Sequence, residues 1–293
     1  MNDVSRARVA VVTGASSGIG RAIAKRLIDA DWRVFGSVRK EDDAEAARVA
    51  LGPGFTPLIF DVTNDAAVRD AARAVGDELG GRTLSALVNN AGIAVSGPAR
   101  YVPLEDVQRQ FDVNVFGVLR VTQAFLPLLG ASPDVKGRPG KIVNMSSVAG
   151  QIATPFFAPY AMSKHALEAL SAALRRELMA HGIDVLVVGP GAVRTPIWEK
   201  GEKADYSAYE ATEYGPALRG VIDHLSGLGE SGIAPEAVGD LVHDMLTGSG
   251  GAPRRAILNN RLVNWVLPRL MPTRLLDRIL ANRFGVGKKA ERS

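Results

Sequence analysis

The stretch ARVAVVTGASSGIG, residues 7–20, is the part of the sequence that indicates the fold most directly. A short run of β-branched and apolar residues leads into a glycine-rich turn, and RAIAKRLIDA (21–30) continues with the apolar spacing of a helix. Such a turn places backbone N–H groups and a helix N-terminus where they can bind a pyrophosphate. A turn of this kind can also join a strand to a helix without any ligand. Its position after the first strand of a βαβ unit favours a dinucleotide.

The same alternation of strand and helix continues along most of the chain. The apolar runs lack the polar alternation of a half-exposed strand, and helical patterns separate them. This arrangement implies a parallel sheet covered on both faces. Right-handed crossovers make such a sheet doubly wound, so we predict a single-domain α/β Rossmann-type fold. The expected strands are 7–13, 32–38, 56–62, 84–90, 141–147, 184–190 and 254–258, and the expected helices include 41–51, 64–79 (capped by Thr63 or Asn64), 104–129, 160–181 and 235–246.

The alternation stops after Asn260, which divides the chain into a predicted NAD(P)-binding domain (1–260) and a C-terminal extension (261–293). The extension has eight Lys and Arg and two acidic residues, a net charge of +6, whereas the rest of the chain carries −2. The basic character therefore belongs to the extension, which argues against a nucleic-acid-binding core.

Within the extension, LPRLMPTRLLDRILANRF (267–284) is predicted to form an amphipathic helix. Its apolar stripe consists of Leu275, Leu276, Ile279 and Leu280, with Arg274, Arg278 and Arg283 interspersed. A basic amphipathic helix can lie on an anionic membrane, but such a stripe more often packs on its own domain or on a sister subunit. We therefore do not favour peripheral membrane contact on sequence grounds.

Composition restricts the classes of protein to which the chain can belong. It has 293 residues, of which 46% are hydrophobic and 23% charged, as expected for a globular protein with a sizeable core. It contains no cysteine, which excludes disulfides, thiolate metal sites and a cysteine nucleophile. We find no signal-peptide pattern at the N-terminus and no stretch approaching ~20 uninterrupted apolar residues, so we expect a cytoplasmic protein without a transmembrane helix. The histidines at 165, 181, 224 and 243 are scattered and predict no metal site.

The residues after the second strand bear on the choice between NAD and NADP. In NAD-binding folds an acid about 20 residues beyond the glycine turn holds the ribose 2′-hydroxyl. Here the strand ends in GSVRK, and Arg39 lies 19 residues beyond Gly20. A guanidinium suits a 2′-phosphate, so we expect NADP(H) to be preferred over NAD(H). The acids at 41–43 would serve a 2′-hydroxyl if the strand ended later, and Arg39 would then be a solvated loop residue.

Tyr160 and Lys164 lie four residues apart in PYAMSKHALEAL (159–170), within a helical pattern. Positions i and i+4 share one face of a helix, so the phenol and the ammonium should point at the same place. This spacing also occurs by coincidence in many proteins, so a catalytic interpretation needs support from other motifs.

An ordered set of motifs provides that support. TGASSGIG (13–20), Asp61-Val62, NNAG (89–92), Asn114 in FDVNVFG, Ser147 in IVNMSS, YAMSK (160–164) and PG (190–191) occur in this order. Each motif is weak alone, but together, over residues 7–200, they resemble the short-chain dehydrogenases/reductases. The segment 150–178 with the basic extension is similar to the steroid and retinol dehydrogenase branch of that family.

The resemblance implies that Asn114, Ser147, Tyr160 and Lys164 are catalytic. Ketone reduction requires a hydride at carbon and a proton at oxygen, and Tyr160 would transfer the proton. Lowering the pKa of a tyrosine from about 10 to 7 takes about 4 kcal/mol of preferential phenolate stabilisation, towards which Lys164 supplies positive charge. Ser147 would hydrogen-bond the substrate oxygen, and Asn114 would hold a water beside Lys164. The alternative is that Ser147 ends a strand, Asn114 is a satisfied buried amide and the Tyr–Lys pair lies on the surface.

The resemblance also implies a set of cofactor-binding residues. The glycine turn would hold the pyrophosphate, Asp61 and Val62 would lie at the adenine, and Lys164 would bind the nicotinamide ribose beside Tyr160. The ribose side would be lined by Asn90, Ala91 and Gly92, and the nicotinamide carboxamide would contact Val193 and Thr195. The full implied set is Gly14, Ser16, Ser17, Gly18, Ile19, Gly20, Arg39, Asp61, Val62, Asn90, Ala91, Gly92, Tyr160, Lys164, Pro190, Gly191, Val193 and Thr195.

Substrate choice depends, by resemblance, on the segment after Ser147 and on the loop 197–232. These segments are rich in aromatic residues and place no arginine pair against a carboxylate, which favours a bulky apolar alcohol or ketone, although several of the aromatics would equally well pack the loop. The predicted substrate-binding residues are Ser147, Gln151, Phe156 and Trp198.

The sequence thus predicts an NADP(H)-preferring oxidoreductase that interconverts a secondary alcohol and a ketone. NAD-dependent alcohol oxidation and a non-catalytic dinucleotide-binding sensor or scaffold are the alternatives. The resemblance further implies a homodimer or homotetramer built from helices 104–129 and 160–181, and the sequence predicts no nucleic-acid partner.

Overall fold

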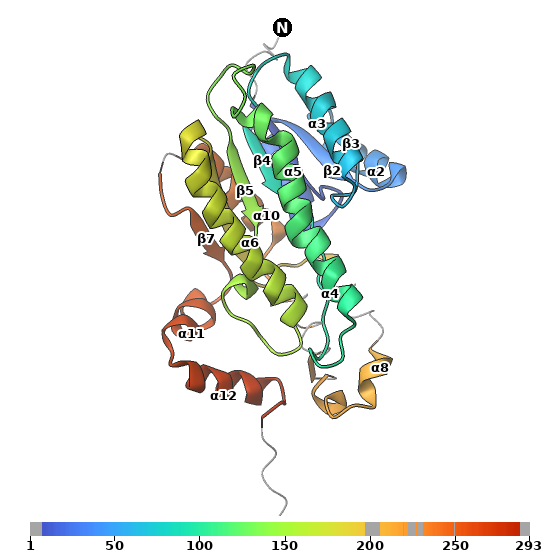
Figure 1. Cartoon of the computed structure of the whole chain (residues 1–293), viewed down its shortest axis with the longest axis vertical. Coiled ribbons are helices and arrows are strands. Elements are labelled where there is room, and N and C mark those ends of the chain that lie inside the picture. Colours follow the sequence, from blue (N-terminus) through green and yellow to red (C-terminus); the bar gives the residue numbers. More distant parts are fainter. Residues whose placement is uncertain are drawn as a thin grey trace, which may run out of the picture.

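The computed structural model describes residues 8–196, 206–218, 220–221, 227, 231–248 and 250–287. Its centre is a seven-stranded sheet in the order β3-β2-β1-β4-β5-β6-β7, in which every neighbouring pair is parallel. The strands are β1 (Val9–Val12), β2 (Arg33–Val38), β3 (Phe55–Ile59), β4 (Ala86–Asn89), β5 (Lys141–Met145), β6 (Asp184–Pro190) and β7 (Arg254–Ile257). This order confirms the predicted doubly wound Rossmann-type sheet (Figure 1).

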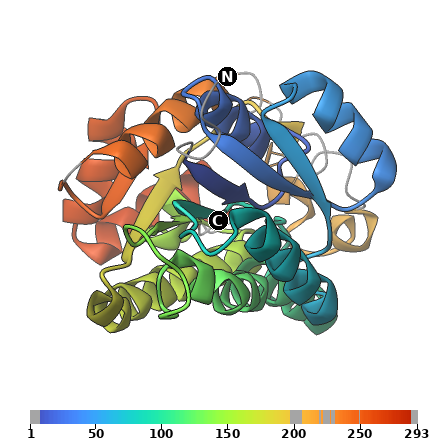
Figure 2. The ribbon, with the colours of Figure 1, turned by 90° about the horizontal axis from the view of Figure 1, so that it is seen from above.

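Helices cover both faces of the sheet (Figure 2). One face carries α1 (Gly18–Ile28), α2 (Glu41–Leu51) and α10 (Pro235–Thr247), and the other carries α3 (Asp65–Leu79), α4 (Leu104–Phe111), α5 (Gly117–Phe125) and α6 (Ala158–Glu177). Alternate residues of one strand enter opposite cores: Ala10 and Val12 join the first core, Val9 and Val11 the second. The strands are buried on both sides, which explains their unbroken apolar runs.

Local signals in the sequence account for several helix boundaries. Of the two residues predicted as the cap of α3, Asn64 has this role, since its side chain accepts a hydrogen bond from the Ala67 N–H at 3.1 Å. α3 ends at Gly80, whose left-handed backbone conformation is characteristic of a helix C-terminus.

The predicted helix over 104–129 is present but is not uniformly α-helical. Between α4 and α5 the turn Asp112–Phe116 is a π-helix, and the last turn, Leu126–Leu129, is a 3₁₀-helix. By length and hydropathy alone Leu104–Leu129 could cross a membrane. Its inner face packs on α3, β4 and α6, which identifies it as a core helix of the domain.

The extension differs from the single helix predicted over 267–284. After a π-turn at Leu262–Val266, α11 (Leu267–Leu270) ends and α12 (Thr273–Arg283) begins. Pro272 lies at the break, because proline has no N–H to continue the helix and disfavours the α conformation in the residue before it. The extension lies beyond the carboxyl ends of the strands, at the same end of the molecule as α8 (Ser207–Glu210) (Figure 1).

A third, smaller hydrophobic cluster joins the extension to the domain. Its buried members are Phe156, Tyr206, Leu218, Val221 and Phe284. They come from three segments far apart in the chain, and we call this group the rim cluster.

Candidate active site

At its glycine positions, the turn between β1 and α1 leaves no room for a side chain. Gly14 and Gly18 have φ of +66° and +54°, in the left-handed region that favours glycine. A Cβ on Gly20 would lie 2.1 Å from the Gly14 carbonyl oxygen. Ser17 is the N-cap residue of α1, and its side chain makes no capping hydrogen bond, so the start of the helix is open to a ligand. Ser16 and Ile19 lie in the same turn, partly exposed.

The NNAG segment after β4 is held against this turn by Thr13. The Thr13 hydroxyl accepts hydrogen bonds from the backbone N–H groups of Asn90 and Ala91, both at 2.9 Å. The Asn90 amide returns hydrogen bonds to the carbonyls of Thr13 at 2.9 Å and Gly14 at 3.2 Å. The predicted ribose-side residues Asn90 and Ala91 therefore lie beside the predicted pyrophosphate site.

The residues that distinguish NADP from NAD lie where β2 ends. The strand stops at Val38, so Arg39 follows it directly and its side chain is exposed. The acids at 41–43 form the first turn of α2, so the alternative in which a longer strand presents them is wrong. Ser37, at the end of the strand, accepts a hydrogen bond from the Gly14 N–H at 2.9 Å and so connects this region to the glycine turn.

The predicted adenine residues lie just beyond β3, which ends at Ile59 rather than at the expected Val62. The Asp61 carboxylate accepts hydrogen bonds from the Thr63 N–H at 2.9 Å and the Thr63 hydroxyl at 2.8 Å, which fixes the loop. Val62 is buried against Gly117, and a Cβ on Gly117 would lie 2.8 Å from Val62 Cγ2.

The segment after β6 returns to the glycine turn. Gly191 donates its N–H to the Ile257 carbonyl, and Val193 pairs with Ile233 in an isolated β-bridge. The course of this segment places Thr195 Cγ2 3.2 Å from the position of a Cβ on Gly18. The predicted nicotinamide residues and the predicted pyrophosphate residues, about 180 positions apart in the chain, are thus neighbours.

Tyr160, Lys164 and Ser147 meet at the carboxyl edge of the sheet. Ser147 follows β5, and its hydroxyl donates a 3.4 Å hydrogen bond to the carbonyl of Pro190 at the end of β6. It also accepts the Ala149 N–H at 3.1 Å and forms a hydrogen bond with Tyr160. The Lys164 ammonium lies 5.7 Å from the centre of the Tyr160 ring and donates to the Met145 carbonyl at 2.8 Å. The helical pair and the strand-end serine therefore form one site.

Burial changes the proton affinities of this site. Burial raises the pKa of Tyr160, and the hydrogen bond with Ser147 opposes part of that rise. Burial also lowers the pKa of Lys164 to about 8, against the opposing charge of Glu168. Tyr160 is thus a protonated phenol at neutral pH, whereas the sequence analysis expected a pKa lowered by Lys164. A protonated phenol is ready to donate a proton.

Asn114 lies in the π-turn of the 104–129 helix and is fully buried. Its side-chain oxygen accepts the Ile93 N–H at 2.9 Å, while its nitrogen donates to the Ile93 carbonyl at 3.0 Å and to Ser163 at 3.1 Å. The amide is therefore satisfied by the protein, as in the alternative weighed from the sequence, and it fixes the residue next to Lys164. Gly92 leaves room for it, since a Cβ there would lie 3.2 Å from the Asn114 oxygen.

Besides Ser147, two of the predicted substrate residues, Gln151 and Phe156, lie in the segment between β5 and α6. Gln151 ends the 3₁₀ turn that follows Ser147, and its buried side-chain oxygen has no hydrogen-bond partner within the described part of the chain. Phe156 belongs to the rim cluster and has φ of +68°, a strained conformation for an aromatic residue. The Gly97 N–H donates to its carbonyl at 2.7 Å. Trp198 lies outside the described residues.

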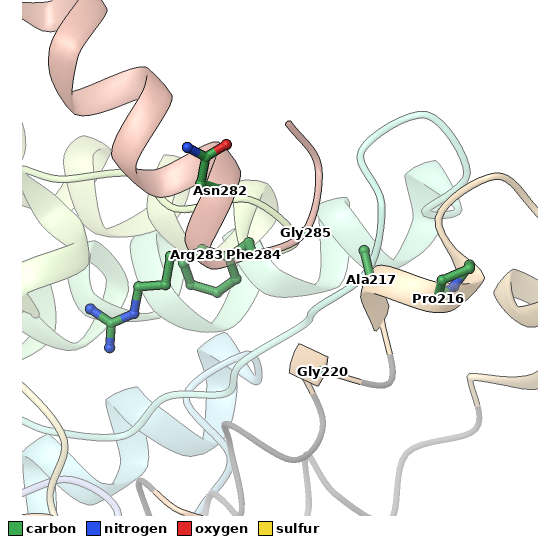
Figure 3. A pocket seen from close by; sticks show the side chains of 7 residues that line it. All are labelled: Pro216, Ala217, Gly220, Asn282, Arg283, Phe284 and Gly285. Atoms are coloured by element: carbon green, nitrogen blue, oxygen red, sulfur yellow. The ribbon is translucent and has the colours of Figure 1, made fainter. Parts of the chain in front are cut away.

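A groove of about 480 Å³ opens beside the rim cluster, between the segment after α8 and the end of α12 (Figure 3). Its lining residues are Pro216, Ala217, Gly220, Asn282, Arg283, Phe284 and Gly285. None of these is a predicted catalytic residue. Phe284 contributes to both the groove and the rim cluster.

The sequence analysis missed several residues that contact the site. Glu168 lies four positions after Lys164 and contacts Ser146 and Arg254. The hydroxyl of Ser96 lies 2.7 Å from that of Tyr206, a member of the rim cluster. The spacing Tyr160-Lys164-Glu168, one residue every four, was a usable signal for Glu168. Arg254 and Ser96 had no such local signal.

The chain is similar to known proteins over most of its length. The family model described as short chain dehydrogenase matches residues 8–205. An NADPH-dependent 3-dehydrocapnine reductase from Ornithobacterium rhinotracheale is 39% identical over 272 residues, covering 93% of this chain and 95% of the relative. A solved short-chain dehydrogenase from Streptomyces avermitilis superposes with a TM-score of 0.75 at 27% identity, covering 99% of this chain and 100% of that one. An actinorhodin polyketide ketoreductase with NADPH gives 0.72 at 30% identity, covering 87% and 96%.

Proposed function

The chain belongs to the short-chain dehydrogenase family, and on that premise we propose that it is an NADP(H)-preferring oxidoreductase that interconverts a secondary alcohol and a ketone. The observation that carries the proposal is the meeting of Ser147, Tyr160 and Lys164 at the carboxyl edge of the sheet, next to the glycine turn. A dinucleotide sensor needs the turn but has no use for this group of side chains.

The residues present fit the dinucleotide. A Cβ on Gly14, Gly18 or Gly20 would meet protein atoms at 2.1–3.2 Å, so only glycine permits this tight turn. The uncapped start of α1 beside the turn would hold the pyrophosphate. Arg39 stands exposed at the end of β2, where a guanidinium suits a 2′-phosphate. The relative named as NADPH-dependent and the solved ketoreductase with NADPH support the preference for NADP(H). When bound, the reduced nicotinamide supplies the hydride.

The side chains divide the remaining chemistry among them. The Ser147 hydroxyl holds the substrate carbonyl oxygen, and the Tyr160 phenol donates its proton to that oxygen as the carbonyl carbon is reduced. The raised pKa of Tyr160 suits this donor role. Lys164, with a pKa of about 8, is mainly cationic at pH 7 and stabilises the phenolate left behind.

The substrate we propose is a bulky, largely apolar ketone. The rim cluster offers aromatic side chains from Phe156, Tyr206 and Phe284, which agrees with the implied likeness to steroid and retinol dehydrogenases. The unpartnered oxygen of Gln151 would accept a hydrogen bond from a donor group near the reacting carbonyl. The relative named as a 3-dehydrocapnine reductase supports ketone reduction as the working direction.

Replacement of Tyr160 by Phe tests the proposal. We expect NADPH binding to be retained while turnover of bulky ketones falls at least about a hundredfold, because the proton donor is removed. Binding is measured by fluorescence titration and turnover by NADPH consumption. Tyr101→Phe, at the surface, is the matched control and should retain full turnover. Near-normal turnover in Tyr160→Phe would exclude the assigned mechanism.

We also propose that the protein forms a homo-oligomer through the outer faces of α4 and α6. Leu104, Phe116 and Met162 are all more than half exposed on these helices or the π-turn between them. Exposed apolar side chains grouped on neighbouring helices suit a subunit interface. Light scattering after gel filtration tests this, since Phe116→Glu should reduce the apparent mass to that of one chain.

A further inference from the structure

A partly buried ion pair behind the catalytic serine has no part in the mechanism described so far. We propose that Glu168 and Arg254 are positioning residues that hold Ser147 in place, and that Trp265 of the C-terminal extension holds the pair. This inference rests on the proposed function, because it concerns the same reaction. It assigns the extension a role in the alignment of the active site.

Glu168 is placed for this role by the helix that carries the catalytic pair. It follows Lys164 by four residues and Tyr160 by eight, so the three side chains lie along one side of α6. Its carboxylate accepts a hydrogen bond from the Ser146 hydroxyl at 2.7 Å. The side chain before the catalytic serine is therefore tied to the catalytic helix.

Arg254, on β7, completes the connection. Its Nε lies 3.0 Å from each Glu168 oxygen, and Nη2 lies 3.0 Å from Oε1, so the guanidinium grips the carboxylate with two nitrogens. Nη2 also donates to the backbone carbonyl of Ser147 at 3.3 Å. The pair thus contacts both residues that follow β5: Ser146 through its side chain and Ser147 through its backbone.

Two glycines provide the space for the pair. A Cβ on Gly189 would lie 2.7 Å from Arg254 Nη2. A Cβ on Gly150 would lie 2.7 Å from the Ser146 hydroxyl and 3.0 Å from Glu168 Cγ. The backbone around the pair is close enough to transmit a displacement of either side chain to the serine.

The extension covers the pair from solvent. The centre of the Trp265 ring lies 4.5 Å from the Arg254 guanidinium and 4.8 Å from the Arg269 guanidinium. Trp265 is only 4% exposed, and the side chains of Glu168 and Arg254 are 15% and 18% exposed. A partly buried ion pair contributes little net stability, so its presence next to the reacting group favours a role in alignment.

Glu168→Gln and Arg254→Met test the proposal with steady-state kinetics. We expect kcat to fall at least tenfold in each, with the NADPH dissociation constant changed less than twofold, and the double variant to be no worse than the poorer single one. Arg254→Lys should recover part of the loss. Asp240→Asn breaks the Arg26–Asp240 pair between α1 and α10 and should leave kcat unchanged.

A second readout does not depend on turnover. Of the charged groups near Lys164, Glu168 favours its protonated form, while Tyr160 on the same helix stays neutral and Arg254 acts through Glu168. In Glu168→Gln the pH above which NADPH affinity falls should therefore move to lower pH. An unchanged pH profile together with an unchanged kcat would overturn the proposal.

Two further outcomes separate the possible failures. If the pH profile shifts as expected while no ketone is turned over even by the unmodified protein, the proposed function fails and the electrostatic link stands. If Arg254→Met does not fold, Trp265→Leu provides the same test with a smaller perturbation of the ion pair. A parallel loss of kcat and NADPH affinity in that variant would show a general structural role and contradict positioning.

A second inference comes from the outer face of the extension. We infer that this face binds the surface of an anionic lipid bilayer. Trp265 and Phe284, 4% and 8% exposed, fix the two ends of the extension to the domain. Six large aliphatic side chains of the extension are 41–76% exposed: Leu262, Val263, Leu267, Leu270, Leu275 and Ile279.

Charge favours a lipid surface over a second copy of the chain. Residues 261–287 carry five arginines and one aspartate. On α12, Arg278 lies about 60° around the helix from Leu275, and Arg283 about 40° from Ile279, so cations flank the apolar stripe. Two copies related by a two-fold axis would bring these arginines together, whereas anionic headgroups would neutralise them.

Co-sedimentation with vesicles tests this inference. The full chain should bind vesicles of phosphatidylglycerol at least tenfold more tightly than vesicles of phosphatidylcholine. Leu267→Ser with Leu270→Ser should abolish the difference, while Val49→Ser with Met179→Ser, exposed apolar residues elsewhere, should not. Equal binding to both lipids, or a change in oligomer mass in the extension variant without any lipid effect, would overturn it.

Discussion

The glycine turn and the rim cluster lie at the same end of the sheet but are built in different ways. The turn consists of backbone in close approach, where Gly20 faces a carbonyl and Thr13 and Asn90 exchange hydrogen bonds across neighbouring strands. The rim cluster consists of side chains from three distant segments, packed outside the two main cores. A substitution in the first region meets immovable atoms, whereas one in the second meets side chains that can rearrange. We therefore expect the cofactor side to tolerate little change and the substrate side to tolerate more.

The largest effect is expected from Gly20→Ala. The new Cβ would lie 2.1 Å from the Gly14 carbonyl oxygen, which forces the pyrophosphate turn to move. Overpacking of this kind costs on the order of 3 kcal/mol, so we expect NADPH affinity to fall at least about a hundredfold together with a lower Tm. Gly220→Ala is the control on the substrate side, because a Cβ there meets nothing within 4 Å. Equal loss in both variants would contradict the contrast between the regions.

Arg39→Ala should weaken NADPH binding by about 10–100-fold, the value of one or two charge-assisted hydrogen bonds at roughly 1.5–3 kcal/mol each. NADH binding should change less than twofold, because NADH has no 2′-phosphate. Titration of the variant with both nucleotides measures this. If both affinities fall together, Arg39 does not bind the phosphate and the preference has another source.

The pH dependence of cofactor binding should report on Lys164. Its pKa of about 8 lies below the ordinary value of 10.5, so the ammonium is present below about pH 8 and is lost as the pH rises further. If the ribose hydroxyls and phosphates favour the cation, the NADPH dissociation constant should rise above pH 8 by up to about tenfold per unit. Lys164→Met should remove this dependence. A rise that persists in Lys164→Met would assign it to another group.

The smallest effect is expected from Phe284→Ala, in the rim cluster. We expect KM for bulky ketones to rise about three- to tenfold, while NADPH affinity and global stability change little, because the cluster lies outside the main cores. Phe125→Ala, in a fully buried position beside the sheet, should instead cost about 3–5 kcal/mol of unfolding free energy. Urea denaturation of both variants measures the difference. Equal destabilisation would mean that the rim cluster is part of the main fold.

Much of the fold could be predicted because its signals are local. The apolar runs, the helical spacing around Tyr160 and the cap at Asn64 depend on residues within a few positions of each other. The doubly wound sheet follows from their order, and the structure confirms it. The candidate site could be assembled from motifs because the carboxyl ends of parallel strands share one edge, which brings Ser147, Asn90 and Pro190 together.

The sequence by itself therefore determined the elements, their order and the side chains that come to that edge, since periodicity and turn chemistry act between near neighbours. Only the tertiary structure decided the satisfied amide of Asn114 and the contact between Gly18 and Thr195. It also decided the Glu168–Arg254 pair, whose members are 86 positions apart. Such contacts depend on how strands and helices pack in three dimensions, and no local pattern encodes which distant side chain will fill a given space.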